Sequence, residues 1–172
     1  TAAAYEQLVS AFLAHDNGVA GHLSAVLALD PHHVRAWSAK AIFTMTLGRS
    51  ELIPAARHAA AMARACLGTD PADGLAVLAA ESLVNGEWLD AIAALEKLLV
   101  LDPADSMAAK MSHALRFMLG DAAGMLASIE RVLARVGLGH RHAGFLLGCK
   151  AFALEENHRF QEAEFVGRSA VE

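Results

Sequence analysis

Small and apolar residues recur at fixed spacings along this chain, and polar residues fill the positions between them. In the clearest stretch, Gly86 is followed by Ala91, Leu95, Leu98 and Pro103. These spacings fit one pair of helices, with the glycine in the turn, the small residue where the helices cross and the leucines on the buried face. The pattern returns about every 34 residues, a period typical of arrays of repeated helix pairs.

Three Asp-Pro steps, Asp30-Pro31, Asp70-Pro71 and Asp102-Pro103, divide the chain into such pairs. Proline is expected to end one helix and prepare the next, because its ring fixes φ and it has no backbone N–H. The second helix of the second pair, from about Glu51 to Cys66, runs longer than its counterparts, so we expect irregular repeats. Within the pairs we expect turns at Asp16-Asn17-Gly18, Gly48, Gly86, Gly120 and His158.

About ten helices in five pairs follow from this division. The first pair covers residues 5–15 and 19–29, the fourth covers 106–136 with Ile129 and Val132 on its buried face, and the fifth starts with 145–155. The composition agrees, since the chain is 55% hydrophobic but only 6% aromatic, which suits closely packed helices. Because no linker or low-complexity tract interrupts the pattern, we predict a single all-α domain over residues 1–172.

The register of Gly86, Ala91, Leu95 and Leu98 is similar to that of tetratricopeptide repeats, and in the second pair Trp37 at the fourth position and Gly48 at the turn fit the same repeat. This resemblance implies an α-solenoid of antiparallel helix pairs, stacked as a right-handed superhelix with a concave surface. We also expect the last pair to lack a polar capping helix. Its open end would then meet further repeats of a longer chain, a partner or a second copy.

Three segments resemble one branch of these repeat proteins, the tetratricopeptide repeat protein 38 family, and they follow in that family's order. They are His15-Asp16-Asn17-Gly18, the stretch from Leu47 to Pro54 and the stretch from Gly148 to Glu156. The resemblance implies a longer protein with further repeats downstream. It implies a fold and little chemistry, so no catalytic residue is transferred.

In such repeats, five positions of the first helix of each pair face the ligand. The middle of the resulting surface is apolar, two carboxylates stand at one end, and only two basic residues are present, too few to grip an acidic peptide terminus. Methionine and phenylalanine suit adaptable docking of an apolar helix or peptide, although such residues at helical spacing also form cores. The candidate binding residues are Arg35, Ser38, Ile42, Met45, Met107, Lys110, Phe117, Met118, Phe145, Phe152, Glu155 and Glu156.

Charge and cysteine content narrow the choice of partners. Lysine and arginine total 14 against 19 acidic residues, a net charge of -5, so no general attraction to nucleic acid or an anionic membrane is expected. Charged residues interrupt every apolar stretch, which argues against a membrane span. Cys66 and Cys149 lie far apart and fit reduced thiols in a cytoplasmic protein.

The candidate chemistry is sparse, and we expect neither a metal nor a cofactor. Glu155 and His158 have the spacing of a di-iron ligand pair, but such sites need a second copy of the motif. His113 occupies a tight-packing position, where we expect a core histidine with satisfied hydrogen bonds. No phosphate-binding loop or nucleophile motif is present.

The pattern therefore favours a helical-repeat scaffold that binds a protein or peptide, or further repeats of its own chain. The alternative is an enzyme or small-molecule-binding protein whose apolar concave cavity is edged by Glu155 and Glu156. A third possibility is self-association through the open end, near Phe160 and Phe165.

Overall fold

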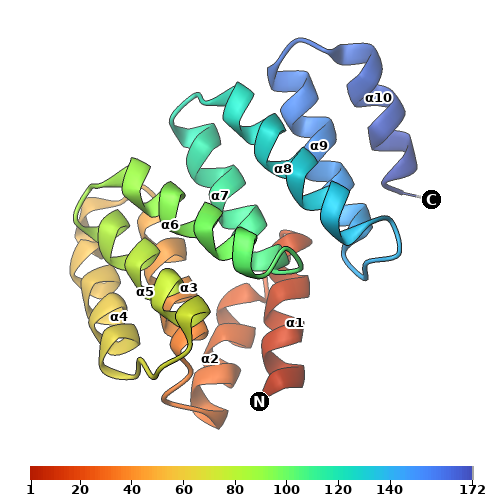
Figure 1. Ribbon diagram of the computed structural model, residues 1–172. Helices are drawn as coiled ribbons and strands as arrows, with labels where there is room; N and C mark the ends of the chain where they lie inside the picture. The colour runs from red at the N-terminus through yellow and green to blue at the C-terminus, as the bar shows by residue number, and fades with distance from the viewer. Residues whose placement is uncertain (172) are drawn as a thin grey trace. The chain divides into compact units, whose positions relative to one another are not determined.

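The computed structural model describes residues 1–171, which form ten α-helices and one short 3-10 helix, with no β-strand in that range (Figure 1). The all-α prediction is therefore confirmed. The helices are α1 (Ala2–Leu13), α2 (Val19–Leu29), α3 (Val34–Thr46), α4 (Ile53–Ala65), α5 (Pro71–Val84), α6 (Trp88–Leu101), α7 (Ser106–Met118), α8 (Ala122–Val136), α9 (Ala143–Glu156) and α10 (Phe160–Ser169).

One backbone conformation recurs in the turn inside each of the five helix pairs of residues 1–171. The φ angle is positive at Gly48 (65°), Gly86 (84°) and Gly120 (72°), which confirms these three predicted turns. His15 (53°) and His158 (60°) adopt the same left-handed conformation, which glycine enters freely and histidine enters more readily than most residues. His158 is thus the turn residue that its register predicts.

Four of these turns also share a hydrogen bond. The residue after the left-handed residue donates its N–H to the carbonyl five positions earlier, the long bond of a Schellman motif. The donor and acceptor residues are Asp16 and Ala11, Glu87 and Ser82, Asp121 and Arg116, and Arg159 and Leu154, at 2.8 or 2.9 Å.

The second pair departs from this arrangement after Gly48. A 3-10 helix at Ser50–Leu52 leads into α4, which has Pro54 in its first turn. The long second helix expected over residues 51–66 is therefore split into a 3-10 turn and an α-helix.

The Asp-Pro steps act in two ways. Asp70 caps α5 and Pro71 is the first residue of that helix, as the sequence predicts. Asp70 accepts the N–H of Ala72 at 2.8 Å, and Asp30 and Asp102 likewise accept the N–H two residues further on at 3.0 Å, but the prolines after Asp30 and Asp102 lie in turns and do not begin a helix. The next helices, α3 and α7, begin only four residues after these aspartates.

The chain divides into two compact units, unit 1 (Thr1–Leu98) and unit 2 (Leu99–Glu172). The boundary falls inside α6. A single domain over residues 1–172 stays a prediction.

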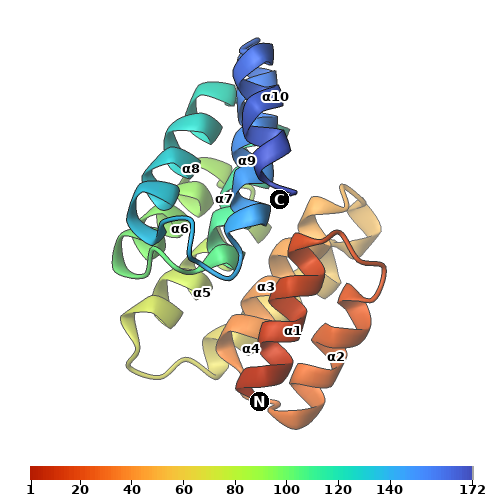
Figure 2. The same ribbon diagram turned by 90° about the vertical axis from the view of Figure 1, so that its right-hand side faces the viewer.

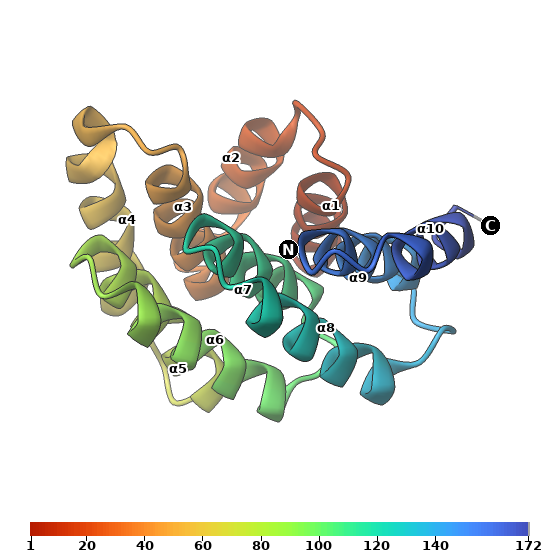
Figure 3. The ribbon, with the colours of Figure 1, turned by 90° about the horizontal axis from the view of Figure 1, so that it is seen from above.

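In unit 1, α1 packs on α2, α2 on α3, and α3 on both α4 and α5; Figure 3 shows α3 beside α4. Small side chains allow these helices to approach closely. The predicted crossing residue Ala91 is fully buried, and Leu95 and Leu98 are each 1% exposed, which confirms their place on the packing face. Other alanines of unit 1 with no exposed surface are Ala36, Ala41, Ala56, Ala59, Ala63, Ala79 and Ala80.

In unit 2, α7 packs on α8, and α9 packs on α7, α8 and α10 (Figure 2). The predicted packing residues Ile129 and Val132 are buried. The innermost side chains are Leu115, Met125, Leu146 and Leu154.

Glycines bring α9 and α10 together. A Cβ at Gly144 would lie 2.9 Å from the carbonyl oxygen of Ala170, and a Cβ at Gly167 would lie 3.7 Å from the Cβ of Ala151. Larger residues at Gly144 would push the two helices apart.

No helix within residues 1–171 has both the length and the apolar character needed to cross a bilayer.

Candidate functional site

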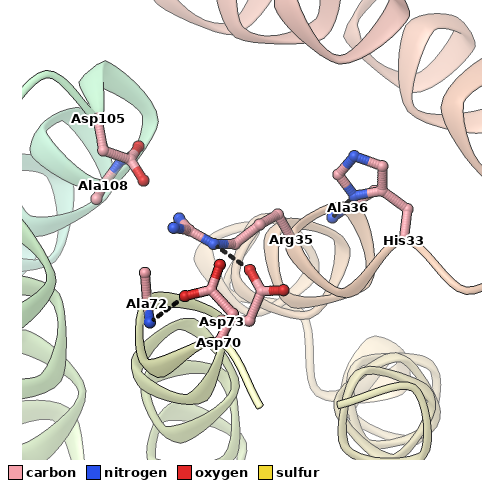
Figure 4. A network of polar contacts seen from close by, with 8 residues as sticks. All are labelled: His33, Arg35, Ala36, Asp70, Ala72, Asp73, Asp105 and Ala108. Carbon is pink, nitrogen blue, oxygen red and sulfur yellow. Dashed lines mark hydrogen bonds and ion pairs between the residues drawn. The ribbon is translucent and has the colours of Figure 1, made fainter. Parts of the chain in front are cut away.

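In unit 1, the predicted binding residue Arg35 is held by an ion pair. Its Nε donates to Oδ1 of Asp73 at 2.8 Å, and both side chains are about three-quarters or more buried. Figure 4 shows Arg35 of α3 pointing to Asp73 in the first turn of α5. The charges of Arg35 and Asp73 therefore neutralise each other.

The remaining predicted residues of unit 1 offer little exposed surface. Ser38 and Ile42 are each 2% exposed, and Met45 is half-buried. The Ser38 hydroxyl has no hydrogen-bond partner in the described part of the chain. A binding role for these three residues stays a prediction.

His33 caps the helix that carries Arg35. Its Nδ1 accepts the N–H of Ala36 at 3.2 Å, as seen in Figure 4. The ring stacks on Tyr5 with the centroids 4.7 Å apart. Burial lowers the pKa of His33, more strongly than the neighbouring carboxylates of Asp30 and Asp73 raise it. His33 is therefore a structural cap.

Unit 2 presents more of its predicted binding residues to solvent. Phe117 is 47% exposed, Met118 45% and Phe145 39%. Lys110 and Phe152 are half-buried, Glu155 and Glu156 are exposed, and Met107 is buried. Exposed aromatic side chains thus lie on both α7 and α9.

Three residues of α7 contact α9. The ring of Phe152 lies edge-on to Phe117, with centroids 5.0 Å apart, and 5.9 Å from the ring of His113. The Nζ of Lys110 lies 3.8 Å from the Sγ of Cys149. The structure therefore brings together Lys110, Phe117 and Phe152, which the sequence placed on one surface.

His113 is a core residue, but its hydrogen bonds are not satisfied as expected. It is 4% exposed, and neither ring nitrogen has a hydrogen-bond partner within residues 1–171. Burial, followed by the charge of Lys110, lowers the pKa of His113 to about 4. The imidazole is therefore neutral at physiological pH.

Cys149 has no features of a nucleophile. Its side chain is buried, and burial raises the pKa of the thiol in spite of the nearby Lys110. A buried thiol with a raised pKa is unreactive.

A hollow of about 470 Å³ opens between α9 and α10. We call it the α9–α10 hollow. Its α9 residues include Phe152 and Glu155, both predicted binding residues. Its lining consists of Gly148, Ala151, Phe152, Glu155, Phe160, Ala163 and Glu164.

Sequence reasoning missed the contribution of α10 to this hollow, because the positional rule covers only the first helix of each pair. Phe160, Ala163 and Glu164 all come from the second helix. The register could have located one of them, since Ala163 follows its turn residue by five positions, as Ala91 follows Gly86.

The carboxylates around the hollow differ in their partners. Glu164 pairs with Arg168 at 2.7 Å on the same helix. Glu155 has no ion-pair or hydrogen-bond partner for its side chain among the residues that the structure describes. Its charge therefore faces the hollow without compensation.

Glu155 and His158 do not form the metal-ligand pair that their spacing allows. His158 lies outside α9, in the left-handed turn, with its ring 5.9 Å from that of Phe160. The described residues contain no group of three or more His, Cys, Asp or Glu that could hold a metal ion.

A scan of the sequence against known protein families found no match, and searches of curated proteins and of solved structures likewise found none.

Proposed function

We propose that this chain binds a protein or peptide through the surface of a tetratricopeptide-like α-solenoid. The left-handed turn shared by five successive helix pairs supports the repeat architecture, because each pair repeats one local geometry. The segments that resemble the tetratricopeptide repeat protein 38 family support the same assignment. The free cysteines, Cys66 and Cys149, are compatible with a cytoplasmic location.

The observation that carries this proposal is the open aromatic surface of unit 2. Phe117, Met118 and Phe145 are exposed, and the ring of Phe117 contacts Phe152, which lines the α9–α10 hollow. Phe145 and Phe152 lie seven residues apart on α9, so they share one helix face. Large apolar side chains exposed together are typical of interaction surfaces.

The composition of this surface favours a peptide or helix as the ligand. Aromatic rings supply large contact area at a low entropic cost, and methionine repacks against different partners. In unit 1 the candidate cation Arg35 is engaged by Asp73. We therefore assign binding to α7, α9 and α10.

The test begins with a random peptide library displayed on phage and selected on the full chain. Calorimetry then compares the tightest peptide on the wild-type chain, on Phe145→Ser and on Leu138→Ser. Leu138 is the control because it is 75% exposed but does not line the hollow. We expect the peptide to bind Phe145→Ser at least tenfold more weakly than the wild-type chain, and to bind Leu138→Ser as tightly as the wild-type chain. Failure to select any peptide, or equal affinity for all three chains, would contradict the proposal.

The volume of the α9–α10 hollow favours a second candidate, a small hydrophobic ligand. About 470 Å³ lies within the usual range of ligand pockets. Native mass spectrometry of the purified chain separates the two candidates, because a retained small molecule displaced by Gly148→Leu would favour this one.

Self-association through the last helix pair is a related proposal. Helix α10 contains no buried residue, and Phe160 and Phe165 are 61% and 74% exposed. This alternative predicts a concentration-dependent mass in light scattering that Phe160→Ser with Phe165→Ser abolishes. A constant monomer mass at high concentration would exclude it.

A further inference from the structure

Helix pairs α7–α8 and α9–α10 can be aligned on their turn residues, Gly120 and His158, which share a left-handed conformation. Counting back three, seven and ten positions from each turn gives Phe117, His113 and Lys110 on α7. The same counts on α9 give three residues that line the hollow, Glu155, Ala151 and Gly148.

The α7 residues at these three positions all contact α9. Phe117 and His113 meet the ring of Phe152, and Lys110 meets the Sγ of Cys149. The alignment extends past the turn, where Ala122 corresponds to Phe160 of the hollow. The carbonyl of Ala122 accepts a hydrogen bond from the side chain of Asn157, at the C-terminal end of α9, at 2.7 Å.

The α9–α10 hollow is therefore the counterpart of the surface on which α9 itself lies. A helix is the element that fills this position on α7–α8. On α9–α10 the same position is open, and its lining includes the small residues Gly148, Ala151 and Ala163.

The charge of the occupant follows from the residue that replaces Phe117. On α7–α8 the Phe152 ring meets the Phe117 ring; on α9–α10 the corresponding residue is Glu155, whose carboxylate has no partner within residues 1–171. Phe152 and Phe160 line the same hollow. Aromatic faces with a carboxylate favour a cation on an aliphatic stem, since the rings pack on the stem and attract the charge.

We infer that the α9–α10 hollow binds an amphipathic helix of a partner protein, with an arginine or lysine of that helix directed at Glu155. The inference rests on the proposed peptide-binding function and names the partner's chemistry. The net charge of -5 also favours a basic partner. In binding of this kind, the apolar face of the partner helix lies in a groove, and one charged residue of that helix lies opposite a group of opposite charge.

The test uses two synthetic helical peptides based on residues 143–157, stapled on the face opposite residue 152. One carries Phe152→Arg and the other Phe152→Glu, and Cys149→Ala in both prevents oxidation. Fluorescence anisotropy measures their affinity for the full chain and for the variants Glu155→Lys and Glu162→Lys. Glu162 of α10 is the matched control because it is an exposed carboxylate that neither lines the hollow nor belongs to the predicted binding residues.

We expect the arginine peptide to bind at least tenfold more tightly than the glutamate peptide. Glu155→Lys should reverse this order, and Glu162→Lys should leave it unchanged. The same order in Glu155→Lys, equal affinities, or no binding of either peptide would overturn the inference. The phage-selected peptides would still bind in that case, so the two proposals fail separately.

Light scattering on the same chains tests the other occupants. A dimer that dissociates in Glu155→Lys would assign the hollow to a second copy and overturn the inference. A constant monomer mass, together with the reversed peptide preference, would support it.

Discussion

Helix pairs α7–α8 and α9–α10 share a turn conformation and a Schellman bond, but one is covered by a following helix and the other is open. The covered pair presents Phe117 and His113 to α9, whereas the open pair presents Glu155 and Ala151 at the same positions. The same backbone pattern thus presents different surfaces in the two pairs. That of α7–α8 packs against a helix, and that of α9–α10 has the carboxylate that we propose to bind a cation.

The largest difference should appear between a residue in the covered region and one on the open helix. Leu146 of α9 is fully buried and Phe165 of α10 is 74% exposed. We expect Leu146→Ala to lower the free energy of unfolding by about 4 kcal/mol, because it leaves a cavity. Phe165→Ala should change it by less than about 0.5 kcal/mol. Urea unfolding measures both, and similar costs would contradict the assignment of covered and open sides.

The next effect is a dependence of stability on pH. Helix α7 contains the buried His113, whereas the corresponding residue of α9 is Ala151, so only α7 should contribute to this dependence. The pKa of His113 is lowered to about 4 by burial in the folded chain and returns to about 6.5 on unfolding. Below pH 6.5 the unfolded chain therefore binds a proton that the folded chain does not. The free energy of unfolding should be highest above pH 6.5 and should fall by about 3 kcal/mol towards pH 4.

His113→Leu is the matching variant. This variant should reduce the fall of the free energy of unfolding between pH 6.5 and pH 4. The smaller contribution of His33 should remain, because burial lowers the pKa of His33 too. At pH 7 we expect it to stabilise the chain by about 1 kcal/mol, because it removes two buried nitrogens that lack hydrogen bonds in the described structure. Urea titrations from pH 4 to pH 8 measure both effects. An unchanged slope would show that His113 is charged or hydrated in the folded chain.

Two glycines of α9 sharpen the contrast between its packed side and its open side. Gly144→Ala brings a Cβ within 2.9 Å of the backbone of Ala170 and should destabilise the chain by about 1 to 2 kcal/mol. A Cβ at Gly148 meets no atom within 4 Å, so Gly148→Ala should stabilise the helix by about 0.5 to 1 kcal/mol. Thermal unfolding should show shifts of opposite sign, and two shifts of one sign would refute this view of α9.

The smallest effect compares the paired charge of unit 1 with the unpaired charge of unit 2. A double-mutant cycle on Arg35→Ala and Asp73→Ala should give a coupling of about 0.5 to 1 kcal/mol. Glu155→Gln should change stability by less than about 0.5 kcal/mol. A larger loss for Glu155→Gln would mean that Glu155 stabilises the fold and is not available to a ligand.

The sequence predicted local structure well because glycine, alanine and leucine report backbone conformation and burial directly. Gly86, Ala91, Leu95 and Leu98 all occupy their predicted places. Pro31 and Pro103 also lie in turns between successive helices, as predicted.

The candidate site was less accessible to sequence reasoning. Position along a helix does not show whether a neighbouring carboxylate neutralises Arg35, or whether Ile42 points to solvent or to the core. The residues of α10 that line the hollow were missed for a different reason. Ligand-facing positions were assigned only to the first helix of each pair, and α10 is a second helix. Tertiary contacts, which sequence spacing does not encode, decide these points.

The most direct test of the α9–α10 hollow is to fill it. Gly148→Leu places a side chain into the open space that an added Cβ meets without contact, so the fold should keep or gain stability. Calorimetry with the tightest phage-selected peptide should show at least a tenfold weaker affinity for this variant, with an unchanged or higher Tm. Equal affinity for the filled and the open hollow would contradict the central claim.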